Sequence, residues 1–331
     1  MTVTIREVAR RAGVAVSTAS RALSGGGPVG EATAERVHAA ATALGYEPNR
    51  WAASLRGGAT KRIAMIVPDL RNPFFADLVK GAQARAREFG YMLFVADTDD
   101  DPREESRMVR TVSDRVDGAL LCTPRTDAEH LDVLTGLAPT VLLHRTSDTT
   151  AYVISDVADG VAQAVANLTA LGHRRIGYVD GPPESWSAAL RRQAIAKAGE
   201  RAGIEITTVA QVAARFDGGV VAGDLAIASG VTAVLAFNDI VAFGLMHRLS
   251  DRGIAVPEDI SIIGFDDVAE ARMSTPALTT VAQPLNLSGR RGVEMLVDLL
   301  AGRELSERAL VLPAHLVVRE TTAVPRPEAR R

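Results

Sequence analysis

Residues 4–24 read TIREVARRAGVAVSTASRALS, a pattern typical of two short helices joined by a tight turn. Thr4 can cap the first helix while Glu7, three residues later, reaches back to it, which is the capping-box arrangement. Gly13 ends this helix, and a second helix is expected over about 16–23. The apolar positions of the first helix share one face: Ile5, Val8, Ala9 and Ala12. The stretch therefore predicts a helix-turn-helix.

A third helix is expected over about 31–44, with Gly45 in the usual position after a helix C-terminus. Three short helices without a convincing strand predict a compact all-α unit over residues 1–46. The loop before the third helix, residues 25–30, has the spacing GxGxxG. A dinucleotide fingerprint of that spacing follows a strand and opens a βαβ unit, whereas this one follows a helix. We therefore interpret it as a loop.

The N-terminal region is basic and the remainder is acidic. Residues 1–62 contain nine Lys and Arg against four Asp and Glu, a net charge of +5, which leaves −8 for the rest of a chain of net charge −3. A basic end on an acidic body suggests that the end meets a polyanion. Chance clustering of charge is the alternative interpretation.

Residues 47–60 are expected to form a linker. Pro48 and the pair Gly57-Gly58 bracket residues 49–56, which could form two helical turns. An isolated helix of that length is not stable in water, so it is expected to fold only when something holds it.

From Lys61 onward, strand and helix patterns alternate, which predicts parallel sheets covered by helices on both faces. Because roughly 270 residues is too many for one such sheet, two doubly wound lobes are expected, with ligands outside the carboxyl ends of their strands. The strand candidates are Ile63–Pro68, Met92–Ala96, Gly118–Cys122, Thr140–Leu143, Tyr152–Ile154, Ile176–Val179, Ala233–Phe237 and Ile260–Phe265. The helix candidates include Phe74–Phe89, Glu104–Arg115, Gly160–Leu171, Ala188–Ala202 and Asp239–Arg252.

The composition, 47% hydrophobic and 23% charged, is that of a soluble globular protein. A single cysteine, Cys122, allows no disulfide framework. No signal peptide or membrane-length apolar run is recognisable, and a cytoplasmic protein is expected. The sequence contains no P-loop, no GxSxG and no zinc-ligand cluster. Neither an enzyme nor a protein with a bound metal or cofactor is therefore predicted.

Beyond the pattern, many segments resemble one known family in order and spacing. In the N-terminal region they are Ile5–Val14, Ser17–Ser24, Leu44–Asn49 and Ala53–Leu55. In the body they are Val67–Asp69, Asn72–Phe75, Leu171–Ile176, Gly181–Pro183, Phe237–Asp239, Val256–Ser261, Gly264–Asp267 and Leu278–Val281. Together they resemble the LacI/GalR family of transcriptional regulators, the lactose-repressor type, over nearly the whole chain.

The resemblance implies a helix-turn-helix DNA-binding domain at 1–46, a hinge helix at 47–60 and an effector-binding and dimerisation domain at 61–331. That domain would have the fold of periplasmic binding proteins, with two doubly wound parallel-sheet lobes. The expected division places about 61–157 and 285–312 in lobe 1, and about 158–282 and 313–329 in lobe 2.

The resemblance also implies DNA contacts. The residues are Thr4, Val16, Ser17, Thr18, Ser20 and Arg21 in the headpiece, and Asn49, Arg50, Ala52 and Leu55 in the hinge. The start of the second helix would read base edges in the major groove. Thr4 and Ser20 would contact phosphates, and Leu55 would wedge into a central base step. Val16 could instead pack in the core, Ser17 could cap the helix, and Leu55 could anchor the linker on the body.

For the effector, the resemblance points to a site between the lobes formed by Asn72, Phe74, Phe75, Arg145, Asp156, Arg191, Phe216, Asn238, Asp239 and Asp266. Carboxylates and arginines that bind hydroxyls, with an aromatic face over a ring, suit a sugar or sugar derivative. Trp186 is a further aromatic candidate. His144 stands where an acidic residue is common.

Each of these residues has a purely structural alternative. Phe74 and Phe75 could be core residues, the three aspartates could cap helices, and Arg191 could lie on a solvated face.

The function that follows is a DNA-binding transcriptional regulator, and the resemblance implies that it acts as a repressor. It would act as a homodimer on a near-palindromic operator in double-stranded DNA, under allosteric control by the small ligand. A sugar-processing enzyme, or a soluble sugar-binding protein with an incidental helical extension, is the rival interpretation. Salt-sensitive DNA affinity separates the two.

Overall fold

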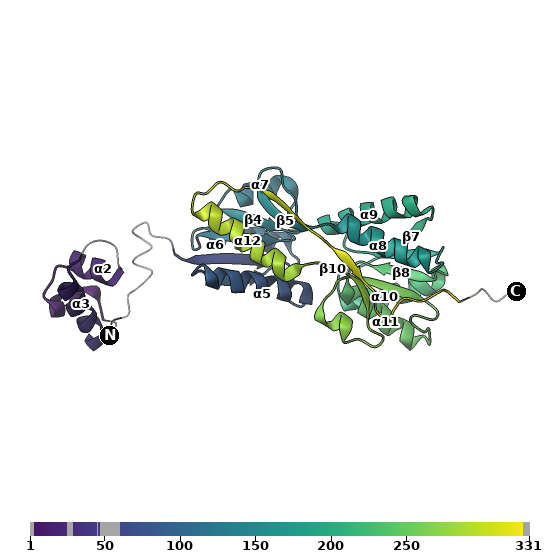
Figure 1. Ribbon diagram of the computed structural model, residues 1–331, viewed down its shortest axis with the longest axis horizontal. Coiled ribbons are helices and arrows are strands. Elements are labelled where there is room, and N and C mark those ends of the chain that lie inside the picture. Colours follow the sequence, from purple (N-terminus) through teal and green to yellow (C-terminus); the bar gives the residue numbers. More distant parts are fainter. Residues whose placement is uncertain (1–2, 25–28, 45, 47–59, 327–331) are drawn as a thin grey trace. The chain divides into compact units, whose positions relative to one another are not determined.

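The computed structural model describes residues 3–24, 29–44, 46 and 60–326. The chain divides into two units, residues 1–60 and 61–331, and each is described by itself (Figure 1). The expectation of an all-α N-terminal unit followed by two parallel-sheet lobes is confirmed. No described helix is long and apolar enough to cross a membrane.

The N-terminal unit consists of α1 (Ile5–Ala12), α2 (Val16–Ser24) and α3 (Glu31–Leu44). The Glu7 carboxylate accepts hydrogen bonds from the Thr4 amide at 2.6 Å and the Thr4 hydroxyl at 2.9 Å, so the predicted capping interaction forms. Gly13 has a φ of +67°, the left-handed conformation that the turn requires. The buried side chains are small, which lets the helices approach closely: Val8, Ala9, Ala12, Ala19, Val37, Ala40 and Ala41.

The first lobe of the second unit contains a six-stranded sheet of order β11-β5-β4-β3-β1-β2, and all its pairings are parallel. Its strands are β1 (Arg62–Val67), β2 (Met92–Asp97), β3 (Gly118–Cys122), β4 (Thr140–Leu143), β5 (Ala151–Ser155) and β11 (Ala309–Leu312). Its helices are α5 (Pro73–Glu88), α6 (Pro102–Ser113), α7 (Ala128–Thr135) and α12 (Leu285–Leu300).

The second lobe contains the sheet β12-β10-β9-β8-β6-β7, in which only β12 runs antiparallel to its neighbour. Its strands are β6 (Ile176–Asp180), β7 (Ile206–Gln211), β8 (Ala233–Ala236), β9 (Ser261–Asp266), β10 (Thr279–Ala282) and β12 (His315–Val317). Its helices are α8 (Val157–Ala170), α9 (Trp186–Ala202), α10 (Phe216–Ser229), α11 (Asp239–Asp251) and the short 3₁₀ helix η1 (Ala269–Arg272).

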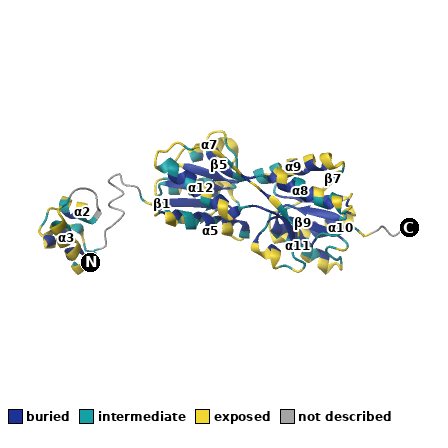
Figure 2. Cartoon of the chain, in the orientation of Figure 1, coloured by how far each residue is buried: buried dark blue, intermediate teal, exposed yellow. Residues whose placement is uncertain are grey.

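The chain passes between the lobes three times, after β5, after β10 and after β11 (Figure 1). Both sheets are buried beneath their helices (Figure 2). Where α12 crosses α5, a Cβ on Gly81 would lie 2.0 Å from the Asn286 carbonyl oxygen, so this crossing requires glycine. Three connections therefore join the two lobes.

The sequence pattern did not indicate four strands: β7, β10, β11 and β12. Three of them, β7, β11 and β12, lie at sheet edges and are partly exposed, so they lack a continuous apolar run. The fourth, β10, has only four residues. A short strand at an edge or beside a crossover carries little hydrophobic periodicity, so only its pairing partners reveal it.

Candidate functional site

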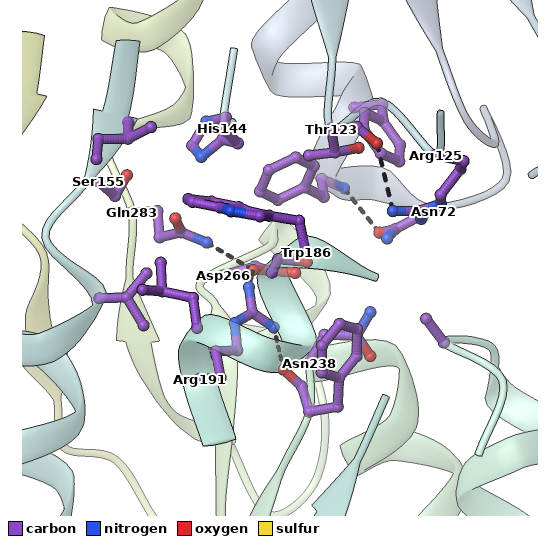
Figure 3. A pocket seen from close by; sticks show the side chains of 18 residues that line it. Asn72, Thr123, Arg125, His144, Ser155, Trp186, Arg191, Asn238, Asp266 and Gln283 are labelled. Atoms are coloured by element: carbon purple, nitrogen blue, oxygen red, sulfur yellow. Dashed lines mark hydrogen bonds and ion pairs between the residues drawn. The ribbon is translucent and has the colours of Figure 1, made fainter. Parts of the chain in front are cut away.

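A pocket lies between the two lobes of the second unit, at the carboxyl ends of both sheets (Figure 3). It holds about 600 Å³ of empty space, counting the part open to solvent. Lobe 1 contributes Asn72, Phe74, Phe75, Thr123, Arg125, His144, Ile154 and Ser155. The remaining lining residues are Val157, Trp186, Ser187, Leu190, Arg191, Ala214, Phe237, Asn238, Asp266 and Gln283. This is where open parallel sheets bind ligands.

A buried ion pair forms the floor on the lobe 2 side. Arg191, at 6% exposure, places Nη2 3.2 Å from Oδ1 of Asp266, and its Nη1 donates to the Phe237 carbonyl. Its guanidinium carbon lies 3.9 Å from the ring centroid of Phe265 and 4.6 Å from that of Phe237. Because Arg191 is buried, the solvated-face alternative for it is wrong.

The carboxylate of Asp266 is held from two sides. Oδ1 also accepts a hydrogen bond from Gln283 Nε2 at 2.8 Å. The backbone of Asp266 has a φ of +123°, a value that residues other than glycine rarely adopt. Burial raises the pKa of Asp266 to about 7, against the opposing influence of Arg191. A proton on this carboxyl group is therefore exchanged close to neutral pH.

The raised pKa of Asp266 predicts a pH-dependent effect of Asp266→Asn. In wild type, the folded protein holds this proton up to about pH 7 and the unfolded chain loses it near 3.8, so Asp266 contributes less to stability as pH rises through that window. The asparagine side chain does not titrate, so the variant does not lose stability in this way as the pH rises. Its free energy of unfolding relative to wild type should therefore increase between pH 5 and 7, by at most about 1.4 kcal/mol per pH unit. Urea titrations at several pH values measure this, and a relative stability that falls with pH contradicts it.

Three polar side chains enter the pocket from the ends of lobe 1 strands: Thr123 after β3, His144 after β4 and Ser155 at the end of β5. Thr123 and His144 adopt left-handed φ values of +39° and +56°. Burial, and secondarily the charge of Arg191, lower the pKa of His144 to about 3, so its imidazole is neutral at ordinary pH.

Aromatic side chains close the pocket. Asn72 caps α5, its Oδ1 accepting from the Phe74 amide at 3.0 Å, which sets Phe74 and Phe75 at the helix start. The Phe74 ring meets His144 edge-on at 5.1 Å between centroids. The Trp186 ring lies between His144 and Asp266 in Figure 3, in the middle of the lining residues.

Four of the ten predicted effector residues lie outside this pocket. Phe216 is 41% exposed and packs on His247 at 5.6 Å between centroids, and Trp186 supplies the aromatic ring instead. Asp156 caps α8, its Oδ1 accepting from the Asp159 amide at 3.1 Å, as the capping alternative holds. Neither residue lines this pocket, and their assignment to the effector stays a prediction.

Asp239 and Arg145 also lie outside the lining of this pocket. Asp239 is fully buried and accepts from the Thr280 hydroxyl at 2.5 Å and the Val268 amide at 2.9 Å, so it fastens β10 and the segment after β9. Burial raises the pKa of Asp239 to about 6. Arg145 is not a lining residue; its guanidinium lies 5.7 Å from the centroid of the Trp186 ring.

The remaining six predicted residues meet at the pocket: Asn72, Phe74, Phe75, Arg191, Asn238 and Asp266. Thr123, Arg125, Ser187 and Gln283 were not predicted. Thr123 and Arg125 follow β3, a strand that the sequence predicts, so their position could have indicated them. Gln283 follows β10, a strand that the sequence did not indicate.

Charged groups also span the cleft beside this pocket. Arg215, ahead of α10 in lobe 2, lies 3.5 Å from Asp69, 3.4 Å from Asp99 and 3.6 Å from Asp100, all in lobe 1. These contacts and the Arg145–Trp186 contact join the lobes and would break if the cleft opened.

In the N-terminal unit, the start of α2 faces solvent. Val16 is 42% exposed, and Ser17 and Arg21 are also exposed, so Val16 does not pack in the core. Thr4 is exposed, and Thr18 and Ser20 are partly exposed. The predicted hinge residues Asn49, Arg50, Ala52 and Leu55 lie outside the described residues. Within the described residues, no cluster of three or more His, Cys, Asp or Glu could hold a metal ion.

Comparison with known proteins matches both units. A family model described as "Bacterial regulatory proteins, lacI family" matches residues 4–49, and one described as "Periplasmic binding protein-like domain" matches residues 165–322. The HTH-type transcriptional regulator DegA of Bacillus subtilis is 33% identical over 98% of this chain and 99% of its own length.

Several solved structures align with nearly the whole chain. A lac repressor dimer bound to operator and the anti-inducer ONPF has a TM-score of 0.87 at 28% identity, covering 98% of this chain and 100% of that one. A complex of the transcriptional regulator CelR with cellobiose has a TM-score of 0.73 at 31% identity, covering 96% of this chain and 99% of that one.

Proposed function

This chain belongs to the LacI family of bacterial regulatory proteins, and we propose that it is a repressor whose operator affinity is set by a sugar or sugar derivative bound between its lobes. Its general role, transcriptional regulation rather than catalysis, follows from the family. The observation that carries the proposal is the buried Arg191–Asp266 pair at the floor of a pocket between two lobes, in one chain with a helix-turn-helix.

The chemistry of the pocket suits a sugar. Vicinal hydroxyls both donate and accept hydrogen bonds, and the lining offers a carboxylate, a guanidinium and the amides of Asn72, Asn238 and Gln283. The Trp186 ring offers an apolar face of the kind that covers the C–H side of a sugar ring. The relative solved with cellobiose supports this class of ligand.

For DNA, we propose that the exposed start of α2 reads base edges through Val16, Ser17 and Thr18, with Arg21 one turn further along. Thr4 and Ser20 would contact phosphates and position the headpiece without reading sequence. The hinge residues Asn49, Arg50, Ala52 and Leu55 would enter the minor groove, with Leu55 as the apolar wedge.

We further propose a homodimer on a near-palindromic operator in the cytoplasm, where DNA is found. Large apolar side chains are exposed on both lobes, and covering them against a second copy would remove them from water. They are Leu70, Met92, Phe94 and Val95 on lobe 1, and Val221, Leu225 and Met273 on lobe 2. The lac repressor relative was solved as a dimer on operator. Two-fold symmetry of the protein would require a matching symmetry in the DNA.

Control by the ligand would act through the angle between the lobes. A ligand held by both lobes favours the arrangement in which its contacts are complete, and it shifts the equilibrium only by that difference in affinity. The contacts of Arg215 across the cleft would be made in one arrangement and lost in another. The change in angle would alter the spacing of the two linkers in the dimer, and with it the ability of both headpieces to bind.

Fluorescence-anisotropy titration on the chain's own upstream DNA tests the proposal. We expect tight binding that weakens steeply with salt, since binding neutralises phosphates, and one sugar of a panel should change the affinity by about five- to 150-fold. Scrambled DNA of equal length is the control. Equal affinity for both DNAs, or no binding at low salt with or without sugars, would contradict the proposed function.

A further inference from the structure

Unpartnered polar atoms are concentrated at the pocket between the lobes. Several buried side-chain polar atoms of the described residues have no hydrogen-bond partner. Four of them belong to pocket-lining residues: Thr123 Oγ1, His144 Nε2, Ser155 Oγ and Arg191 Nε. A buried polar group without a partner destabilises a folded protein, and native structures contain few. Their gathering at one pocket indicates that a molecule entering it supplies the partners.

Three of these atoms lie together on lobe 1, and we call Thr123, His144 and Ser155 the polar edge. They stand at the ends of β3, β4 and β5, which are successive neighbours in the sheet. The Thr123 amide donates to the Leu143 carbonyl and the His144 amide donates to the Val153 carbonyl, each at 2.8 Å, so the backbone fixes both turns. The His144 and Ser155 side chains are more than nine-tenths buried.

The polar edge carries no net charge. Two of its members have hydroxyl groups, and burial lowers the pKa of His144 to about 3, which leaves its imidazole neutral. Arg125, the lining cation nearest in sequence, donates from Nε and Nη2 to Asp100 Oδ1 at 3.0 and 2.8 Å, and from Nη1 to the Thr123 carbonyl.

The arginine on the opposite side of the pocket also already has partners within the protein. Arg191 is paired with Asp266 and bonded to the Phe237 carbonyl. An anionic group on a ligand would therefore find each arginine of the described lining already beside a carboxylate. Burying an unpaired charge is costly, whereas hydroxyl groups match donors and acceptors of either kind.

We propose that Thr123, His144 and Ser155 are specificity residues that bind hydroxyl groups of the effector and select an uncharged polyol over its phosphorylated or acidic derivatives. The inference rests on the proposed function, since it assigns the ligand class of that same pocket. Neutral His144 accepts or donates through Nε2, and the two hydroxyls do either, so the edge matches a run of adjacent ligand hydroxyls.

The proposal predicts opposite effects on stability and binding. Removing an unpartnered buried hydroxyl removes an unsatisfied group from the ligand-free protein, so the melting temperature stays level or rises. The same change removes a partner of the ligand, so affinity falls. A hydroxyl with a merely structural role would instead lower the melting temperature and leave affinity unchanged.

The test uses the full chain, isothermal titration calorimetry and thermal melting. The panel contains D-ribose, D-glucose, D-galactose and cellobiose, together with ribose 5-phosphate, glucose 6-phosphate, gluconate and galacturonate. We expect an uncharged member to bind and its charged derivatives to bind at least about tenfold more weakly. Ser155→Ala and Thr123→Val, which is isosteric, should each lower the affinity for that sugar about tenfold, with melting temperature unchanged or raised.

Ser288→Ala is the matched control, because Ser288 is fully buried on α12, its hydroxyl also lacks a partner, and it does not line the pocket. This variant should bind the sugar as wild type does. A charged derivative that binds more tightly overturns the inference, as do pocket variants with lower melting temperature and unchanged affinity. If no uncharged sugar binds while the protein still binds its upstream DNA, the inference fails and the regulatory function stands. If the wild-type protein does not bind its upstream DNA, the result contradicts the proposed regulatory function and not only this inference.

Discussion

Arg191→Met should abolish the response to the effector and destabilise the second unit. The variant leaves Asp266, at 3% exposure, without its cation. Breaking a buried pair by removing one partner costs about 3–5 kcal/mol. We expect the lower end of that range at pH 7, because Asp266, whose pKa lies at about 7, can take up a proton. Urea denaturation followed by circular dichroism measures this loss.

Two further variants make the result specific. Arg191→Met with Asp266→Asn removes both charges and should recover most of the lost stability without restoring effector binding. Arg201→Met changes the same residue type on the same helix, α9, at an exposed position, and should match wild type in both measurements. Effector affinity in the Arg191 variants should fall about a hundredfold or more, since hydrogen bonds to a charged group are lost. Full effector response in Arg191→Met would refute its role in the pocket.

Ala19→Asp should eliminate operator binding while leaving the second unit intact. Ala19 is fully buried in the N-terminal unit, whose core is built mostly of alanine. A buried carboxylate without a partner costs several kcal/mol, on the order of the whole stability of so small a domain. The headpiece should therefore unfold, and DNA affinity should fall at least about a hundredfold.

The matched control is Ala39→Asp, which adds the same charge to an exposed position on α3. It should reduce DNA affinity only slightly, through charge alone. Anisotropy titration measures DNA binding, and thermal melting with the effector reports the second unit, which is expected to behave as wild type in both variants. Retained DNA binding in Ala19→Asp, or its complete loss in Ala39→Asp, would show that burial in this core is not what operator binding depends on.

Local signals in the sequence were sufficient for the headpiece and for most of the alternating pattern of the body. The capping interaction of Thr4 with Glu7 and the turn at Gly13 depend on residues a few positions apart, so they are legible without any tertiary information. Long buried strands such as β1 and β9 are apolar throughout because both faces of a parallel sheet are covered. The strands β7, β10, β11 and β12 carry a weaker signal and were missed.

Within the pocket, six of the lining residues were found through the family resemblance, whereas Thr123 and Ser155 were missed although their strands, β3 and β5, were predicted. Arg191 and Asp266 come from the family resemblance, and only the structure shows that they pair across 75 residues of sequence. Gln283 follows the short strand β10. Its side chain donates a hydrogen bond to Asp266 only because β10 pairs with β9. Phe216 and Trp186 were both aromatic candidates, and nothing local distinguished the one that lines the pocket.

The sequence by itself determined most of the order of elements, the division into a helical headpiece and an alternating body, and the family, because these depend on periodicity, turn chemistry and motif spacing along the chain. Only the tertiary structure decided which side chains face one another: Trp186 rather than Phe216, Asp239 as an internal fastener, and the unpartnered edge of Thr123, His144 and Ser155. The physical reason is that strand order in a sheet, and the left-handed turns at the strand ends, bring together residues far apart in sequence. Burial and unmet hydrogen bonds are properties of that assembled surface.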